Sequence, residues 1–194
     1  MIEDCTALIL AGGESRRMGQ DKANLVLDGQ TLLQRMVNIV QPLFAEVIVS
    51  VRQPRREVAL PQVCDNPTQA GPLAGLTAGL ERAKTRWVFA VACDMPFITP
   101  ALIEYLARQR ADWQAVVPRV GGYPQPLAAF YAAACLPAVH DCLEGNGKHS
   151  LRALLDTLPV RYVSEDEMRV TDTELASFFD LDTPQDVRQA MRQR

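Results

Sequence analysis

Residues 5–22 read CTALILAGGESRRMGQDK, an apolar run that changes at two glycines into a polar, basic loop. The run Cys5–Leu10 has the length and composition of a strand that is buried on both faces. Gly12 and Gly13 end the run, because glycine weakens a strand and is common where the chain turns. The loop over residues 14–22 follows. The segment therefore predicts a buried strand whose carboxyl end opens into a loop rich in hydrogen-bond donors.

The residue types of this loop are suited to binding a triphosphate. Glycines let backbone N–H groups approach an anion closely, arginines offer forked pairs of donors to phosphate oxygens, and a lysine adds a mobile positive charge. The P-loop spacing G-x-x-x-x-G-K-[ST] is absent, and no G-x-G-x-x-G follows the strand, which argues against a dinucleotide-dependent oxidoreductase. The residues alone leave one alternative open, a glycine turn with solvated arginines.

Beyond this loop, helical and strand patterns alternate along the chain. Apolar residues recur at helical spacing over residues 31–40, and a second helix is predicted from Gly71 to Lys84, with Pro72 in its first turn. Further helices are predicted over residues 99–110, 132–143 and 150–158, and after Thr183-Pro184. Further strands are predicted over residues 47–51, 63–64, 87–92, 115–118, 127–131, 160–163 and 178–181.

This alternation predicts an α/β fold: a three-layer, mostly parallel, Rossmann-like sheet flanked by helices. Gly121-Gly122, between two of the later strands, indicates a small antiparallel excursion in the second half of the chain. Asp94 directly follows the apolar strand 87–92, so we expect it at the same sheet edge as the loop 14–22. Ligands of open α/β sheets bind beyond that edge.

Composition bounds the possible partners. With 194 residues and 48% hydrophobic residues, the chain is expected to form one domain over residues 1–194. Its formal net charge of −3 argues against nucleic acid as a partner. No apolar run reaches the roughly 18 residues of a membrane span, and no export signal is recognisable, which favours the cytoplasm and no membrane partner. The five cysteines form no C-x-x-C pair and are expected to be free, buried thiols.

The segment from Leu10 to Lys22 fits the pattern L-A-G-G-x-S-x-R-M-G-x-D-K and resembles the signature of the molybdenum cofactor guanylyltransferases, within the nucleotidyltransferase superfamily. Three further segments are similar to other blocks of that family, namely Gly71-Pro72-Leu73-Ala74-Gly75, Cys93-Asp94-Met95-Pro96-Phe97 and Asp182-Thr183-Pro184. Their order and spacing agree over nearly the whole chain.

This resemblance implies transfer of GMP from GTP to the terminal phosphate of molybdopterin, which gives the guanine dinucleotide cofactor and pyrophosphate. The N-terminal half would bind the nucleotide and the C-terminal half the acceptor, metal-free or loaded with molybdenum. It implies these roles: Leu10, Ala11, Gly12 and Gly13 approach the nucleotide through the backbone, Arg17 and Lys22 bind its phosphates, Asp65 lies near base or ribose, and Asp94 holds Mg²⁺. Ser50 stands where the family commonly has Asn. Other cofactor-assembly proteins or recipient molybdoenzymes are implied as partners.

The chemistry makes few demands on the protein. A phosphate monoester, with a second pKa of about 6, is largely dianionic at neutral pH, so the acceptor needs no strong general base. Catalysis then depends on alignment and on offsetting the charge of the departing pyrophosphate, the task expected of Arg17, Lys22 and a metal on Asp94. Two rivals remain: a cytidylyltransferase acting on the same pterin, whose first block usually reads L-A-A-G, and a non-catalytic nucleotide-binding adaptor.

Weaker patterns stay open. Asp180 and Asp182 would point to the same side of a strand and suit a metal, but Asp182 would equally cap the last helix with Thr183. The loop 144–150, which contains His149, is either an acceptor contact or a solvated loop. The segment 121–127 is the better candidate for the acceptor site.

Overall fold

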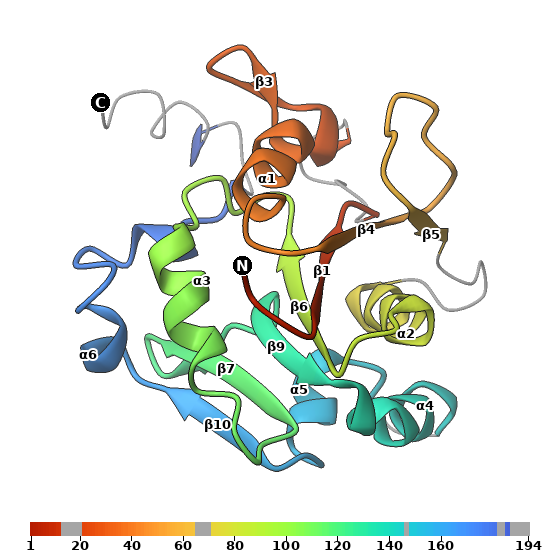
Figure 1. Ribbon diagram of the computed structural model, residues 1–194, viewed down its shortest axis with the longest axis vertical. Coiled ribbons are helices and arrows are strands. Elements are labelled where there is room, and N and C mark those ends of the chain that lie inside the picture. Colours follow the sequence, from red (N-terminus) through yellow and green to blue (C-terminus); the bar gives the residue numbers. More distant parts are fainter. Residues whose placement is uncertain (13–20, 65–70, 146–147, 182–184, 187–194) are drawn as a thin grey trace.

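The computed structural model describes residues 1–12, 21–64, 71–145, 148–181 and 185–186. Its main sheet has eight strands in the order β10-β7-β9-β6-β1-β4-β5, with β8 paired to β7 (Figure 1). The strands are β1 (Cys5–Leu10), β4 (Glu46–Val51), β5 (Gln62–Cys64), β6 (Trp87–Ala92), β7 (Ala115–Val120), β8 (Tyr123–Pro124), β9 (Ala128–Ala132) and β10 (Val160–Val163). A separate antiparallel pair joins β2 (Val26–Leu27) and β3 (Gln30–Thr31).

The sheet is parallel around β1 and antiparallel around β9. β1 pairs in parallel with both β4 and β6, and β5 pairs in parallel with β4. β9 runs antiparallel to β6 and to β7, and β10 is again parallel to β7. Gly121 and Gly122, with φ of 57° and 79°, form the turn between β7 and β8. A mostly parallel sheet with an antiparallel excursion in the second half is confirmed.

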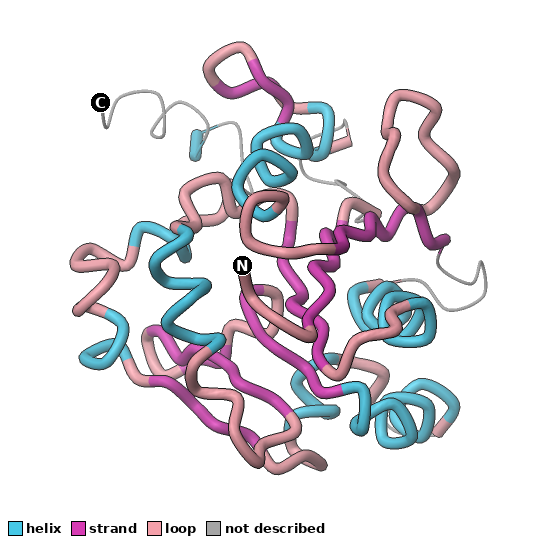
Figure 2. Tube along the Cα trace, viewed as in Figure 1, coloured by secondary structure: helices cyan, strands magenta, loops and turns pink. Residues whose placement is uncertain are grey.

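Helices cover both faces of this sheet. They are α1 (Leu32–Val40), α2 (Pro72–Arg82), α3 (Pro100–Ala107), α4 (Leu136–Glu144), α5 (Leu151–Leu155) and α6 (Glu165–Met168), with short 3-10 helices η1 (Lys22–Asn24), η2 (Ala133–Cys135) and η3 (Ala176–Phe178). In Figure 1, α3 and α6 lie on one side of the strands and α2 and α4 on the other. The helical coils and the extended strands alternate along the trace (Figure 2).

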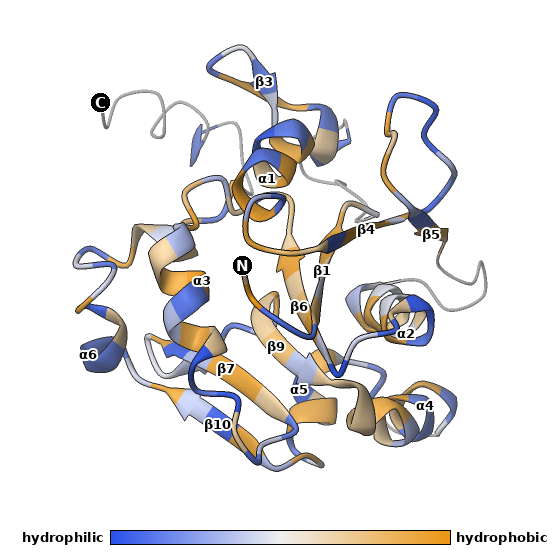
Figure 3. Cartoon of the chain, viewed as in Figure 1, coloured by the Kyte–Doolittle hydropathy of each residue, from blue (hydrophilic) through white to orange (hydrophobic). Residues whose placement is uncertain are grey.

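Alternate side chains of β1 separate the two halves of the core. Ala7 and Ile9 pack into a cluster with α1 and α3, whereas Leu8 packs into a second cluster with α2, α4 and α5. Successive strand residues point to opposite faces, and both faces of β1 are covered, so its side chains are apolar throughout. Figure 3 shows the same pattern as hydrophobic colour on the inner strands. These two clusters give the three layers that were predicted.

The structure differs from the sequence predictions at several places. The helix predicted from residue 132 begins at Leu136, because Ala132 still belongs to β9 and η2 intervenes. The strand predicted over 178–181 is wrong: Phe178 ends η3, and the Asp172 carboxylate accepts hydrogen bonds from the Ala176 and Ser177 N–H groups, which stabilises a tight turn there. α6 was not predicted. Two of the five cysteines are not buried as expected: Cys142 is half-buried, and Cys64 is exposed because it ends the edge strand β5.

The helix predicted after Thr183-Pro184 falls largely outside the described residues, as does Asp182. Within the described part of the chain, no helix is long and apolar enough to cross a membrane.

Candidate active site

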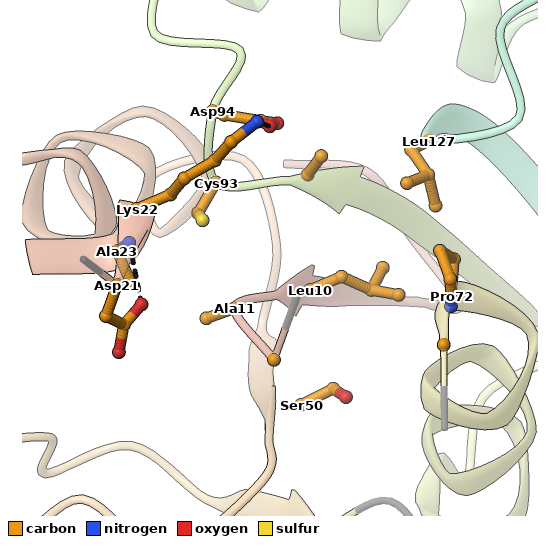
Figure 4. A pocket seen from close by; sticks show the side chains of 13 residues that line it. Leu10, Ala11, Asp21, Lys22, Ala23, Ser50, Pro72, Cys93, Asp94 and Leu127 are labelled. Atoms are coloured by element: carbon orange, nitrogen blue, oxygen red, sulfur yellow. Dashed lines mark hydrogen bonds and ion pairs between the residues drawn. The ribbon is translucent and has the colours of Figure 1, made fainter. Parts of the chain in front are cut away.

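A cavity of about 190 Å³ lies where β1 and β6 end (Figure 4). β1 is flanked by β4 and β6, which follow it in the chain on opposite sides, and this is where ligands bind in open α/β sheets. The strands remain bonded up to the cavity, since Ala11 N donates to Ser50 O at 2.9 Å and Cys93 N donates to Leu10 O at 3.2 Å. The lining residues are Leu10, Ala11, Gly12, Asp21, Lys22, Ala23, Ser50, Gly71, Pro72, Ala92, Cys93, Asp94 and Leu127.

Lys22 and Asp94 face each other in this cavity. Lys22 Nζ lies 2.7 Å from Asp94 Oδ2, and the two side chains are only 21% and 19% exposed. Such partial burial strengthens their attraction relative to a pair in open water. Figure 4 shows the lysine side chain extended toward the carboxylate. Two residues 72 positions apart in the sequence thus meet at one point of the sheet edge.

Each partner is fixed by local backbone structure. Lys22 begins η1, and the Asp21 carboxylate caps this turn by accepting a hydrogen bond from Ala23 N at 3.0 Å. Asp94 follows β6, and its carbonyl oxygen accepts a hydrogen bond from Leu181 N at 3.0 Å. Leu181 is fully buried against Leu27 and Leu32. The C-terminal segment therefore holds the backbone that carries the Asp94 carboxylate.

The amino end of α2 also faces the cavity. Gly71, the residue before the helix, has a φ of 123°, a conformation that glycine adopts readily and other residues do not. Gly71 and Pro72 both line the cavity, so the partial positive charge at the start of this eleven-residue helix lies beside it. Helix starts of this kind bind phosphate groups.

Cys93, although next to Asp94, is not suited to be a nucleophile. Burial, reinforced by the nearby Asp94 carboxylate, raises the pKa of its thiol to about 12. At neutral pH the thiol therefore stays protonated, and the thiolate is the reactive form. The described residues that line this cavity therefore offer an ammonium group and carboxylates, and no activated cysteine.

A second, larger cavity of about 740 Å³ adjoins the first. Gly71, Pro72 and Leu127 line both, so the two cavities share a wall. The other lining residues of the second cavity are Leu73, Ala74, Pro126, Leu143, Glu144, His149, Ser150 and Leu151. The predicted acceptor segment contributes Pro126 and Leu127. The loop 144–150, for which an acceptor contact and a solvated loop were both left open, contributes Glu144, His149 and Ser150.

Six of the residues predicted from the sequence line the first cavity: Leu10, Ala11, Gly12, Lys22, Ser50 and Asp94. Gly13, Arg17 and Asp65 lie outside the described residues. Asp21 and Leu127 were not predicted as nucleotide-site residues. The signal for Asp21 was its place directly before Lys22, as the cap of a turn. Leu127 carried no such signal, because an apolar residue at a strand start is typical of any core.

The site fits a divalent cation whose coordination shell would be supplied partly by the protein and partly by a bound nucleotide. In the described residues no three His, Cys, Asp or Glu side chains cluster as a metal site. Mg²⁺ in nucleotide sites is commonly held by one or two carboxylates together with phosphate oxygens and water, not by a cage of protein groups. The Asp94 carboxylate, at the edge where phosphates would lie, supplies a donor of that kind.

The parallel sheet, the paired Lys22 and Asp94 at its carboxyl edge and the adjoining second cavity are the features that the sequence predicted for a nucleotidyltransferase, and the family comparison identifies that class. The chain belongs to the family of the MobA-like NTP transferase domain, whose family model matches residues 7–163.

The similarity to named relatives extends over nearly the whole chain. It is 39% identical over 188 residues to a probable molybdenum cofactor guanylyltransferase of Pelotomaculum thermopropionicum, which covers 95% of this chain and 91% of the relative. It is 36% identical over 192 residues to a molybdenum cofactor guanylyltransferase of Syntrophotalea carbinolica, covering 97% and 91%. Its fold matches the crystal structure of molybdopterin-guanine dinucleotide biosynthesis protein A from Archaeoglobus fulgidus, with a TM-score of 0.84, 27% identity and coverage of 95% and 96%.

Proposed function

We propose that this protein transfers GMP from GTP to the terminal phosphate of molybdopterin, giving the guanine dinucleotide form of the cofactor and pyrophosphate. The names of its relatives support the reaction and its substrates. The observation that carries the proposal is the meeting of Lys22 and Asp94, 2.7 Å apart, beside the start of α2 and next to a second cavity.

The reaction is an in-line displacement at the α-phosphorus of GTP. An oxygen of the acceptor phosphate forms the new P–O bond, and the bond from the α-phosphorus to the bridging oxygen of the β-phosphate breaks, so pyrophosphate leaves with that oxygen. The acceptor is largely dianionic at neutral pH, and no protein base is needed to activate it. Lys22, with Arg17 from the same loop, offsets the charge that grows on pyrophosphate.

Nucleotidyltransferases of this family generally use a divalent metal ion. We assign Mg²⁺ to this chain and the carboxylate of Asp94 to the metal. When bound, the ion would neutralise phosphate charge and orient the phosphate oxygens. The chain's own contribution is to hold that carboxylate in place, through the strand end at Ala92 and the hydrogen bond from Leu181 N.

The two cavities suggest how the substrates divide between the halves of the domain. The nucleotide would occupy the cavity at the ends of β1 and β6, with Leu10, Ala11, Gly12 and Gly13 close to it and Ser50 and Asp65 toward its ribose or base. The pterin would occupy the larger cavity over Leu127 and α4, so that its phosphate meets the α-phosphate near Gly71. We place this reaction in the cytoplasm, with cofactor-assembly proteins or recipient molybdoenzymes supplying or accepting the pterin.

Pyrophosphate release from GTP and from CTP, each with Mg²⁺ and molybdopterin, tests the proposal. We expect release that requires the pterin and is faster with GTP. A clear preference for CTP would identify a cytidylyltransferase instead. Nucleotide binding without any pterin-dependent release of pyrophosphate would identify a non-catalytic adaptor.

A further inference from the structure

The loop between β4 and β5 contains an arginine, Arg55, whose side chain contacts a residue of the active site. Residues 52–61 extend away from the sheet and are mostly hydrophilic (Figures 1 and 3). Arg52 and Arg56 in this loop are exposed. The side chain of Arg55, in contrast, is only 13% exposed. Burying a charged guanidinium is costly unless hydrogen bonds or an ion pair replace its contacts with water, so Arg55 must have such partners in the protein.

The backbone of Arg55 is fixed to the sheet by one side chain of β5. Gln62 Nε2 donates to the carbonyl oxygens of Arg55, at 2.8 Å, and Val58, at 3.0 Å. Gln62 Oε1 in turn accepts a hydrogen bond from Arg55 N at 2.8 Å. These three bonds close the loop onto the strand. The backbone of Arg55 is therefore held in a defined position, although the residue belongs to a long loop.

The guanidinium of Arg55 bridges the two residues that enclose Lys22 and Ala23. Its Nη2 is bonded to Asp21 Oδ2, and its Nη1 donates to Asn24 Oδ1 at 3.0 Å. Asp21 uses its other carboxylate oxygen to cap η1 through Ala23 N. The turn that carries Lys22 is thus held at both ends by one planar, forked side chain, the geometry that distinguishes arginine from lysine.

The positive charge of Arg55 also affects Lys22, because it offsets the negative charge of Asp21. Asp21 lines the first cavity, where its carboxylate would otherwise compete with Asp94 for the Lys22 ammonium. The guanidinium on Asp21 offsets that negative charge. Lys22 is left directed at Asp94, as the 2.7 Å distance between Nζ and Oδ2 records.

We propose that Arg55 is a positioning residue that fixes the Asp21–Asn24 turn and so directs Lys22 into the active site. The placement of Lys22 rests on the contacts above. Its consequence for catalysis rests on the proposed nucleotidyl transfer. The inference is therefore tested by one measurement that needs no activity and one that does.

The first measurement is the rate at which lysines are acetylated by an amine-specific reagent, read by mass spectrometry. The chain has three lysines, and Lys84 and Lys148 are exposed internal references for Lys22. We expect Lys22 to react slowly in the wild-type chain and faster in R55A, while the two reference lysines keep their rates. R56A, which removes the exposed neighbouring arginine, should match wild type. Equal Lys22 rates in R55A and R56A would overturn the proposal, whether or not the protein transfers GMP.

The second measurement is the steady-state kinetics of GTP-dependent pyrophosphate release. We expect R55A to lose about 10- to 100-fold in kcat, as misplacing a catalytic group does, with a smaller change in KM for GTP. R55K, which keeps the positive charge but lacks the paired N–H donors of a guanidinium, should have a kcat between those of R55A and wild type. In a K22A background R55A should cost little more, because Arg55 acts through Lys22. The inference would be contradicted if the fold losses in kcat of K22A and R55A multiplied in the double variant. It would also be contradicted if R55A and R56A had the same kcat.

Discussion

Asp94 carries more of the proposed chemistry than any other single side chain in the described site. Its carboxylate contacts Lys22 through Oδ2 and lies at the edge where β6 ends. We expect D94N, which keeps the shape and removes the charge, to lower kcat by about 10²- to 10³-fold, because charge stabilisation in the transition state is lost. GTP affinity should fall far less, and isothermal titration beside a turnover assay measures both. D141N, a change on the exposed surface of α4, is the matched control. Wild-type turnover in D94N would refute the metal role.

The same ion pair predicts competition between Lys22 and a metal ion. The ammonium occupies one oxygen of the carboxylate that is assigned to the metal, so a cation that binds without nucleotide must displace it or share it. We expect K22M to bind Mn²⁺ more tightly than wild type in the absence of GTP, by about ten-fold, the scale of one partly buried charge contact. Electron paramagnetic resonance titration of free Mn²⁺ gives the affinity. Equal or weaker binding in K22M would show that Lys22 does not compete for this carboxylate.

Single residues were predictable to different degrees, for a physical reason. Lys22 and Asp94 follow apolar strands, and the carboxyl ends of parallel strands meet at one edge, so their proximity could be predicted without coordinates. Arg55 could not be found this way. It lies in a polar surface loop, where an arginine is ordinary, and only the fold brings it to Asp21. Ser50 was named only through the family resemblance, and the structure places it beside the end of β1, where it pairs with Leu10 in the sheet register.

Among the helices, α2 depends on close contact with β1. A Cβ built on Gly79 would overlap the side chain of Leu8, with Leu8 Cδ1 only 2.7 Å away, and both residues are buried. We expect G79A to lower the free energy of unfolding by about 1–2 kcal/mol, because overpacking costs about 1–3 kcal/mol and the better helix propensity of alanine returns up to about 1 kcal/mol.

Urea unfolding followed by circular dichroism measures the effect of G79A. The neighbouring change A78G gives the propensity effect of glycine in the same turn. A G79A protein more stable than wild type would mean that Leu8 moves aside at little cost.

Helices and strands with strong periodicity were predicted well, and short capped segments were not. The strands 5–10, 87–92 and 160–163 have the predicted bounds. α6 has four residues, too few for an apolar period, and its signal was instead the capping box in which Ser164 and Glu167 bond each other's backbone. The segment 178–181 looked like a strand because it is apolar and aromatic, yet a left-handed Leu175 and the Asp172 cap turn the chain there.

Across the whole molecule, the two cavities proposed for the substrates lie side by side and share one wall. The parallel strands β1, β4 and β6 end at the first cavity, whereas the second cavity lies toward α4, α5 and the start of β9, with Gly71, Pro72 and Leu127 between them. The sequence predicted the parallel half from alternating patterns. The second cavity was only partly foreseen, because the loop before α5 carries polar residues that are equally typical of solvated loops.

This division predicts that nucleotide and acceptor binding are separable, and the two histidines of the chain test it. His149 lines the second cavity, whereas His140 lies on α4 and contacts Glu81 at 2.8 Å. We expect H149A to raise KM for molybdopterin about 3- to 10-fold, the scale of one hydrogen bond, with GTP affinity unchanged. H140A should change neither constant. Because both variants remove an exposed imidazole, a nonspecific effect would appear in both. Weakened GTP binding in H149A, or an unchanged KM for the pterin, would place the acceptor elsewhere than in the second cavity.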